Sequence, residues 1–214
     1  AAADALVKAA LAAHSQDNVS ALVVRIDALP PCRLQDELAA SASLSVPKRQ
    51  KPGQQLAGFT IESVLAESRT TVVYLAHNDQ QQRVVIKTLT ELAANDDELV
   101  ERFLAEAWLM KRAASHYLPE LVEPAERGWL LYAMRWYPGE TLADKLARGE
   151  RISTVEAVRI GLRLTRALSG LHRQDILHRD IKPDNLHLDL EGRLRLLDLG
   201  VAHCPGITPE QASI

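Results

Sequence analysis

The feature that most constrains this chain is a polar run from His178 to Asn185, which reads His-Arg-Asp-Ile-Lys-Pro-Asp-Asn. Asp198-Leu199-Gly200 follows, thirteen residues after Asn185. Between the two stretches, the alternating segments 186–188 and 194–197 predict two short strands, and residues 189–192 supply the turn that joins them. The sequence therefore predicts a loop, a hairpin and a second acidic residue in a fixed order.

These residue types, at this spacing, suit the transfer of a phosphoryl group. Asp180 can accept a proton from a substrate hydroxyl, and Lys182 can neutralise charge on the group that moves. Asn185 and Asp198 offer oxygen ligands to Mg²⁺. A charged loop between a helix and a hairpin is the structural alternative, and the position of Asp198 argues against it.

In this order the motifs resemble those of the eukaryotic-like serine/threonine protein kinases, and the resemblance covers residues 57–204. It implies an α+β, two-lobed kinase-like fold, with ATP and Mg²⁺ as cofactors and the Ser/Thr hydroxyls of proteins as acceptors. Asp180 and Lys182 would be catalytic, and Asn185 and Asp198 would bind the metal. Because sixteen residues follow Asp198, we expect a kinase domain over 57–214 that is truncated in its C-lobe and inactive as a fragment.

The segment before the polar run has the patterns of a small sheet with one long helix. Strands are predicted at 59–65, 71–76, 83–87 and 129–134. A helix is predicted over 96–112, because two aspartates open it and suit its N-terminal dipole. Further helices are predicted at 141–146 and 153–171. By the resemblance, residues 135–137 would be the hinge between the lobes.

The resemblance assigns several residues of this segment to nucleotide binding. Lys87, at the end of its strand, would contact the α- and β-phosphates. Glu106 lies on the apolar face of the predicted helix, where a carboxylate needs a cationic partner. We therefore expect Glu106, rather than Glu101, to pair with Lys87. The other implied nucleotide contacts are Leu65, Val73, Val85, Met134, Asn185 and Asp198.

Two places depart from the pattern of the resembled family. Three glycines that would shape a phosphate-binding turn are replaced, at the same spacing, by Ala66, Ser68 and Thr71. Glycine lets backbone N–H groups approach phosphates closely, so we expect weak nucleotide affinity. His187 stands where the family has an aliphatic residue under the adenine ring. Two interpretations stay open for it, a stacking or pH-sensitive contact and a tolerated aromatic ring.

Residues 1–29 have a different character from the rest of the chain. The segment 4–13 predicts a helix and the segment 21–27 predicts a buried strand, with Asp17-Asn18 between them. This order resembles the C-terminal end of the metal-dependent protein serine/threonine phosphatases, in which Asp17 would be a ligand of Mn²⁺ or Mg²⁺. A simple helix-to-strand turn is the alternative. The remaining ligands of such a site would lie upstream.

Composition restricts the class of protein. Residues 30–56 contain four prolines and a basic cluster at 48–51, which predicts an inter-domain linker. A net charge of −3 gives no reason to expect a nucleic-acid partner. Cys32 and Cys204 have no metal-ligand spacing, which indicates a reduced, cytoplasmic setting. No apolar run approaches the ~20 residues of a membrane span, although attachment through sequence beyond this chain stays open.

Together these features predict an ATP-dependent protein serine/threonine kinase module, fused to a protein phosphatase and acting in bacterial signalling. Its partners would be protein substrates and its own phosphatase domain. A nucleotide-binding pseudokinase that regulates the phosphatase is the alternative, and a small-molecule kinase also stays open. By the resemblance, Arg179 would clamp a phosphorylated residue downstream of Asp198. Thr208 and Ser213 are the candidates in this sequence, and sequence past residue 214 stays open.

Overall fold

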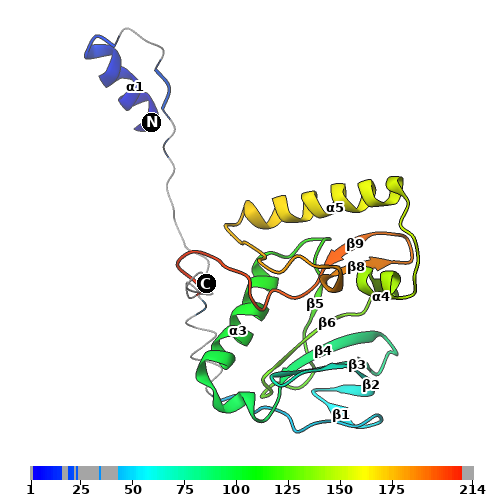
Figure 1. Ribbon diagram of the computed structural model, residues 1–214. Helices are drawn as coiled ribbons and strands as arrows, with labels where there is room; N and C mark the ends of the chain where they lie inside the picture. Colours follow the sequence, from blue (N-terminus) through cyan, green and yellow to red (C-terminus); the bar gives the residue numbers. More distant parts are fainter. Residues whose placement is uncertain (1, 16–18, 22, 24–33, 35–42, 209–214) are drawn as a thin grey trace. The chain divides into compact units, whose positions relative to one another are not determined.

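The computed structural model describes residues 2–15, 19–21, 23, 34 and 43–208, and the chain divides into two units, 1–33 and 34–214 (Figure 1). In the first unit, α1 spans Ala2–Ala12, where a helix was predicted over 4–13. Its Leu6 and Leu11 side chains are each 56 % exposed. Of the strand predicted over 21–27, only Ala21 and Val23 are described, and neither of these two residues lies in a strand.

The second unit is built on a six-stranded antiparallel sheet in the order β1-β2-β3-β4-β6-β5 (Figure 1). Its strands are β1 (Gln55–Leu56), β2 (Phe59–Glu67), β3 (Thr71–His77), β4 (Arg83–Leu89), β5 (Leu121–Val122) and β6 (Leu131–Arg135). The four strands predicted from alternation correspond to β2, β3, β4 and β6. The sequence did not predict the two-residue strands β1 and β5, which are too short to show a period.

Side-chain alternation gives the sheet two different faces. In β4, Val84 and Ile86 are buried, whereas Val85 and Lys87 are half-buried. The buried face belongs to an apolar cluster of residues from several strands. Its members are Leu56, Ala57, Phe59, Ile61, Val72, Tyr74, Ala76, Val84, Ile86 and Ala133. The half-buried face is the one that carries Lys87.

The second half of the segment expected to be a linker lies against this lobe. The backbone N–H of Gln50 donates to the Tyr74 hydroxyl at 3.0 Å, and Ser45 forms a β-bridge with Trp129. Leu44 and Val46 pack on the larger apolar core. Residues 43–56 are thus part of the packed structure, because a few apolar side chains anchor a stretch whose composition is otherwise that of a linker.

One long helix, α3 (Asp97–Arg112), packs beside the sheet. It confirms the helix predicted over 96–112. Asp96 caps it, because its carboxylate accepts the backbone N–H groups of Glu98 and Leu99 at 3.0 and 3.2 Å. The helix turns Phe103 and Met110 into the larger core. This packing fixes the side of α3 that carries Glu106.

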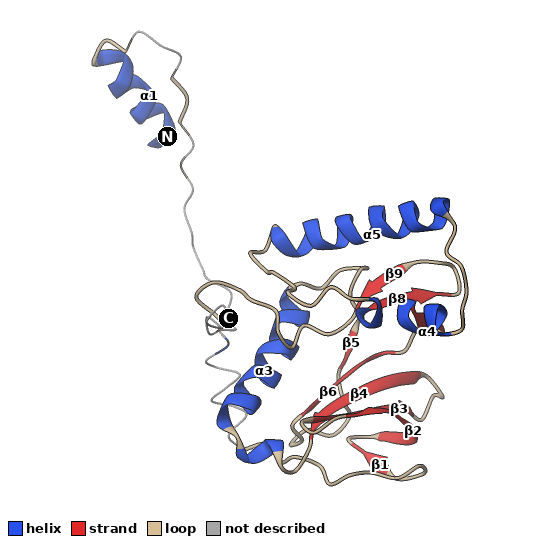
Figure 2. Cartoon of the chain, viewed as in Figure 1, coloured by secondary structure: helices blue, strands red, loops and turns tan. Residues whose placement is uncertain are grey.

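The rest of the unit combines helices with a three-stranded sheet in the order β7-β8-β9, so strands and helices together make an α+β fold (Figure 2). Its elements are β7 (Gly139–Thr141), α4 (Leu142–Ala147), α5 (Thr154–His172), β8 (Leu186–Asp189) and β9 (Leu194–Leu196), with 3₁₀ turns at Ala93–Asn95 and Pro183–Asn185. The chain turns into β7 at Gly139, where an added Cβ would lie 2.2 Å from the Leu188 carbonyl oxygen. Only glycine permits that approach of β7 to β8.

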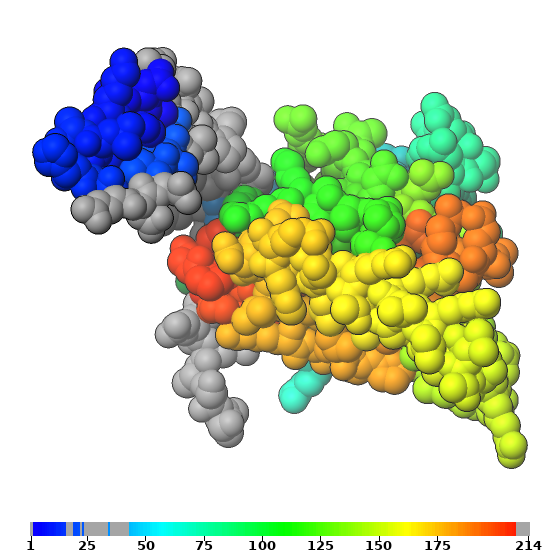
Figure 3. Space-filling view, turned by 90° about the horizontal axis from the view of Figure 1, so that it is seen from above, coloured from blue at the N-terminus to red at the C-terminus, as the bar shows by residue number. Residues whose placement is uncertain are grey.

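The helix α5 forms a ridge along the surface in the view from above (Figure 3). Ser153 caps it by accepting the Glu156 backbone N–H at 3.2 Å, and Leu171 and Ala167 face the core. In the described ranges of the chain, no helix is both long and apolar enough to span a bilayer.

Candidate active site

Lys87 reaches from β4 to a carboxylate on α3. Its Nζ lies 2.8 Å from Glu106 Oε1 and 2.9 Å from Glu106 Oε2, and 3.3 Å from Asp198 Oδ1. Glu106 is 3 % exposed, because it shares the inward side of α3 with Phe103 and Met110. The structure thus brings together three of the residues singled out in the sequence, and their roles toward a nucleotide stay predictions.

Burial and charge compete at this cluster. Burial raises the pKa of Glu106 to about 7, even though Lys87 donates to the carboxylate. Burial also opposes the charge on Lys87, but Glu106 and Asp198 outweigh it and raise the lysine pKa. For Asp198, burial opposes ionisation, and Lys87 with the backbone N–H of Gly200 outweighs it, so the aspartate pKa is lowered. Lys87 and Tyr132 donate hydrogen bonds to Glu106, and these bonds favour its carboxylate form. The contact between Glu106 and Lys87 is therefore an ion pair.

Apolar side chains surround Lys87 on the half-buried face of the sheet. Val73 is the register partner of Lys87, and Met134 is the register partner of Val85. Since opposite residues in an antiparallel pair point to one face, these three apolar side chains share the face of Lys87. Leu65 lies at a register irregularity between Val64 and Ala66 and is 50 % exposed. All four apolar positions expected to contact a nucleotide therefore lie on β2, β3, β4 and β6.

The turn between β2 and β3 uses its own backbone donors internally. The Ser68 hydroxyl accepts the N–H of Thr70 at 3.2 Å and the N–H of Thr71 at 3.0 Å. The Ser68 N–H in turn donates to the Thr71 carbonyl at 2.9 Å. The N–H groups of Thr70 and Thr71 are thus bound to the side chain of Ser68, a position where the resemblance implies a glycine.

The polar run forms a compact set of contacts around Asp180. Its Oδ2 accepts the Lys182 ammonium at 2.7 Å and the Asn185 amide Nδ2 at 2.9 Å. The Lys182 hydrogen bond lowers the pKa of Asp180 most. Asn185 also donates Nδ2 to the Asp180 carbonyl at 2.9 Å, so its amide oxygen points to another side and is available as a metal ligand.

His178 connects this loop to the segment that leads to Asp198. Its Nε2 lies 3.1 Å from the Leu197 carbonyl, and its Nδ1 lies 3.4 Å from the Asp180 backbone N. Burial lowers the pKa of His178, and a neutral ring fits one donated and one accepted contact. Arg179 and Asp198 adopt left-handed backbone angles, with φ of 63° and 61°. Such angles cost roughly 1 kcal/mol or more and often mark functional sites.

His187 contacts the segment 135–137, which was expected to be the hinge. Its Nε2 lies 3.1 Å from the Tyr137 carbonyl oxygen, and burial lowers the pKa of the ring. The neutral imidazole can therefore donate to that carbonyl. The Arg195 guanidinium stacks on the Tyr137 ring, with its carbon 3.4 Å from the ring centroid, and pairs with Asp189 at 3.0 Å. The structure gives His187 a structural contact and leaves its nucleotide role a prediction.

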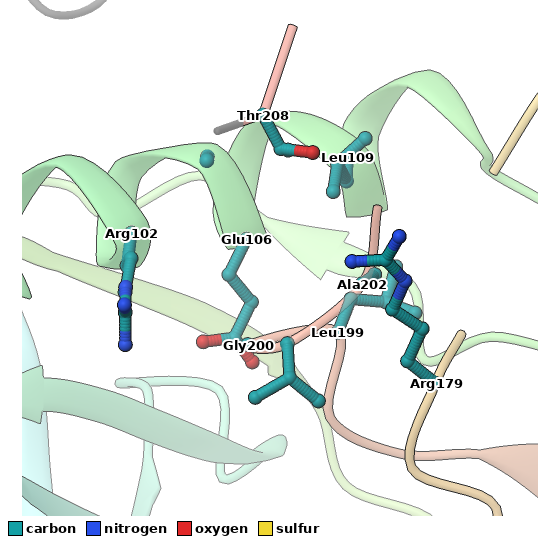
Figure 4. Close-up of a pocket in the computed structure, with 10 residues that line it drawn as sticks. Arg102, Glu106, Leu109, Arg179, Leu199, Gly200, Ala202 and Thr208 are labelled. Atoms are coloured by element: carbon teal, nitrogen blue, oxygen red, sulfur yellow. The ribbon is translucent and has the colours of Figure 1, made fainter. Parts of the chain in front are cut away.

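A pocket lies between α3 and the segment after Asp198 (Figure 4). The Glu106 side chain descends from α3 beside Leu199 and Gly200, and Arg102 and Arg179 lie on its two sides (Figure 4). Thr208 also lines this pocket, and its hydroxyl lies 3.1 Å from His203 Nδ1. The arginine and the threonine singled out in the sequence therefore line the same pocket.

Two further residues bear on the sequence analysis in different ways, one as an untested prediction and one as an addition. Asp17, the expected phosphatase metal ligand, lies outside the described residues. Tyr132, which was not singled out, donates its hydroxyl to Glu106 Oε1 at 2.8 Å. The signal for Tyr132 was its position two residues before Met134 in a strand, which places both side chains on one face.

Comparison with known proteins gives one family. A model of the protein kinase domain matches residues 59–209. The chain is similar to the serine/threonine-protein kinase PknA of Corynebacterium glutamicum, at 28 % identity over 73 % of this chain and 35 % of that protein. It is also similar to serine/threonine-protein kinase PrkC of Bacillus subtilis, at 29 % over 70 % of this chain and 24 % of the relative. A probable serine/threonine-protein kinase of Streptomyces coelicolor is 31 % identical over 69 % of this chain and 23 % of its own length. The chain thus spans about a third or less of these relatives.

Proposed function

This chain belongs to the protein kinase domain family, and from that premise we propose that it is the nucleotide-binding part and catalytic loop of an ATP-dependent protein serine/threonine kinase in bacterial signalling. The observation that carries the proposal is the contact of Lys87 with both Glu106 and Asp198. These residues come from β4, from α3 and from the segment after β9. A charge cluster assembled from such distant segments is suited to hold a polyphosphate in one orientation.

Each charged residue has a distinct chemical role in this proposal. Lys87, held by Glu106, orients the α- and β-phosphates. Asp180 has one carboxylate oxygen engaged by Lys182 and Asn185, and its other oxygen can accept the proton of a Ser/Thr hydroxyl. Lys182 balances charge on the transferred group. The Asn185 amide oxygen and the Asp198 carboxylate fit a hard cation, and Mg²⁺ bound there would neutralise phosphate charge.

The test is the Asp180→Asn variant of the full-length protein. We expect phosphoryl transfer to a protein substrate to be abolished while the nucleotide dissociation constant stays nearly unchanged, because Asp180 acts on the hydroxyl. Asp184→Asn is the matched control, since it removes an exposed carboxylate from the same loop. Near-normal transfer by Asp180→Asn would remove the proposed role.

The second candidate function is a nucleotide-binding pseudokinase that regulates an attached domain. The Ser68 turn favours it, because the hydroxyl holds two N–H groups that would otherwise face phosphate. A single-turnover experiment with enzyme in excess over labelled ATP separates the two candidates. Transfer of label to protein supports the kinase, and nucleotide binding without any transfer supports the pseudokinase.

For residues 1–29 we propose the end of a metal-dependent phosphatase domain, on the sequence pattern around Asp17 alone. Since one aspartate does not make a two-metal site, we expect no release of phosphate from phosphopeptides by the 214-residue chain. In the full-length protein, Asp17→Ala should abolish Mn²⁺-dependent release. Unchanged release would show that Asp17-Asn18 is only a turn.

A further inference from the structure

Tyr132 is a buried polar residue that the proposed mechanism does not use. It lies on β6 as the register partner of Lys87 and is 7 % exposed. Its ring packs on Phe103 of α3, with the centroids 5.3 Å apart. Its hydroxyl donates to Glu106 Oε1 at 2.8 Å. The residue therefore contacts α3 both through an apolar ring and through a directed hydrogen bond.

The hydrogen bonds around the Glu106 carboxylate show what this hydroxyl adds. Oε1 accepts both Lys87 Nζ at 2.8 Å and the Tyr132 hydroxyl at 2.8 Å, whereas Oε2 accepts Lys87 Nζ at 2.9 Å. Lys87 has a flexible side chain that is also drawn toward Asp198. Tyr132 instead has a rigid ring that packs on Phe103, and its hydroxyl hydrogen-bonds to Glu106.

The hydroxyl is suited to remain a donor. Burial, followed by the neighbouring Glu106 charge, raises the pKa of Tyr132 well above its ordinary value. The group therefore stays protonated and points its hydrogen at the carboxylate. A charge-assisted hydrogen bond in a buried setting is stronger than one between neutral groups.

We propose that Tyr132 is a positioning residue, which fixes the Glu106 carboxylate and with it α3 in the orientation that pairs with Lys87. The inference rests on the proposed kinase function for its effect on transfer, but the effect on α3 is independent of activity. With the hydroxyl present, Lys87 meets a carboxylate that is already oriented when a nucleotide arrives. Without it, Glu106 rotates more freely and the lysine spends less time in the productive position.

The experiment compares Tyr132→Phe with Tyr74→Phe in the full-length protein. Phenylalanine keeps the ring packing on Phe103 and removes only the hydroxyl. Tyr74 is the matched control, because it is another buried tyrosine in the same lobe whose hydroxyl binds the Gln50 backbone instead of Glu106. The measurements are kcat and KM for ATP, the thermal midpoint, and amide hydrogen exchange over residues 97–112.

We expect Tyr132→Phe to lower kcat about ten-fold, as loss of one hydrogen bond to a charged group implies, and to speed exchange in α3. Tyr74→Phe should lower the thermal midpoint by a similar amount and leave kcat and α3 exchange unchanged. In a Glu106→Gln background, adding Tyr132→Phe should lower kcat by less than two-fold, because the two residues act in series.

Two outcomes overturn the inference. Unchanged α3 exchange in Tyr132→Phe would show that the hydroxyl does not hold the helix, whether or not the protein is a kinase. Equal effects of Tyr132→Phe and Tyr74→Phe on kcat would show a general loss of stability. If the wild-type protein transfers no phosphate while Tyr132→Phe still speeds α3 exchange, the proposed kinase function fails and the positioning of Glu106 stands.

Discussion

Replacing Ser68 by alanine should tighten nucleotide binding if the turn between β2 and β3 binds the phosphates as the proposed function requires, although the change removes a polar side chain from that turn. In the structure the Ser68 hydroxyl accepts the N–H groups of Thr70 and Thr71 at 3.2 and 3.0 Å. A phosphate that uses these N–H groups must first displace the hydroxyl. Alanine frees both donors and leaves the backbone conformational range almost unchanged.

The expected gain follows from those two bonds. Exposed hydrogen bonds between neutral groups are worth ~0.5 kcal/mol each in net terms, so opening the turn costs ~1 kcal/mol. That amount corresponds to about five-fold in a dissociation constant. Ser68→Gly should gain at least as much, because it also permits the close backbone approach that alanine does not. The difference between the two variants then measures the contribution of glycine itself.

The assay is a calorimetric titration of the full-length protein with a non-hydrolysable ATP analogue and Mg²⁺. Ser115→Ala is the matched control, because its hydroxyl also accepts a nearby backbone N–H, that of Tyr117 at 3.3 Å, in an exposed turn. Its affinity should equal that of the wild type. An unchanged or weaker affinity of Ser68→Ala would refute the reasoning, and the assignment of residues 65–74 to the phosphate-binding turn would be lost with it.

Three further predictions concern single charged residues. Lys87→Met should weaken productive nucleotide binding in the same titration, because it removes the cation that bridges Glu106 and Asp198; equal affinity would contradict the phosphate role. Asp96→Ala should lower the free energy of unfolding by about 1 kcal/mol in urea, since it removes the cap of α3, and Asp97→Ala should lower it less. For Asp189, burial opposes ionisation, but hydrogen bonds from Arg193 and Arg195 outweigh it and lower the pKa. A carboxylate whose pKa is lowered on folding stabilises the fold above its ordinary pKa, and this stabilisation is lost as the pH falls through the lower pKa of the folded protein. The stability difference between wild type and Asp189→Asn should therefore shrink as the pH is lowered through the acidic range; a constant difference would contradict this.

The parts of the fold that were predictable have strong local patterns. Alternation identified β3 and β4, because each buries one face of a sheet, and an acidic start with an apolar face identified α3. The loop from His178 to Asn185 was recognisable because its chemistry restricts each residue type. These elements needed no knowledge of which strand pairs with which.

The remaining features depend on contacts between distant segments. The role of Tyr132 follows from the register of β4 against β6, which places it opposite Lys87. The Ser68 hydrogen bonds depend on the geometry of the turn. The spacing of Ala66, Ser68 and Thr71 in the sequence does not reveal that geometry. Residues 43–56 have the composition of a linker, yet contacts of Leu44, Val46, Ser45 and Gln50 and the pairing of β1 with β2 join them to the rest of the unit. Single-sequence patterns do not report such pairings.

The packing of residues 43–56 has a practical consequence for anyone who isolates this domain. The family match begins at residue 59, and a polypeptide cut there would lack β1 and the backbone that meets the Tyr74 hydroxyl. The side of the sheet that residues 43–56 cover would then be exposed to solvent. The edge of β2, which carries Phe59 and Ile61, would be left unpaired and would favour association between copies. A boundary placed before Ser43 keeps that side covered. Limited proteolysis should accordingly spare the peptide bonds between Leu44 and Leu56 for as long as the sheet is intact.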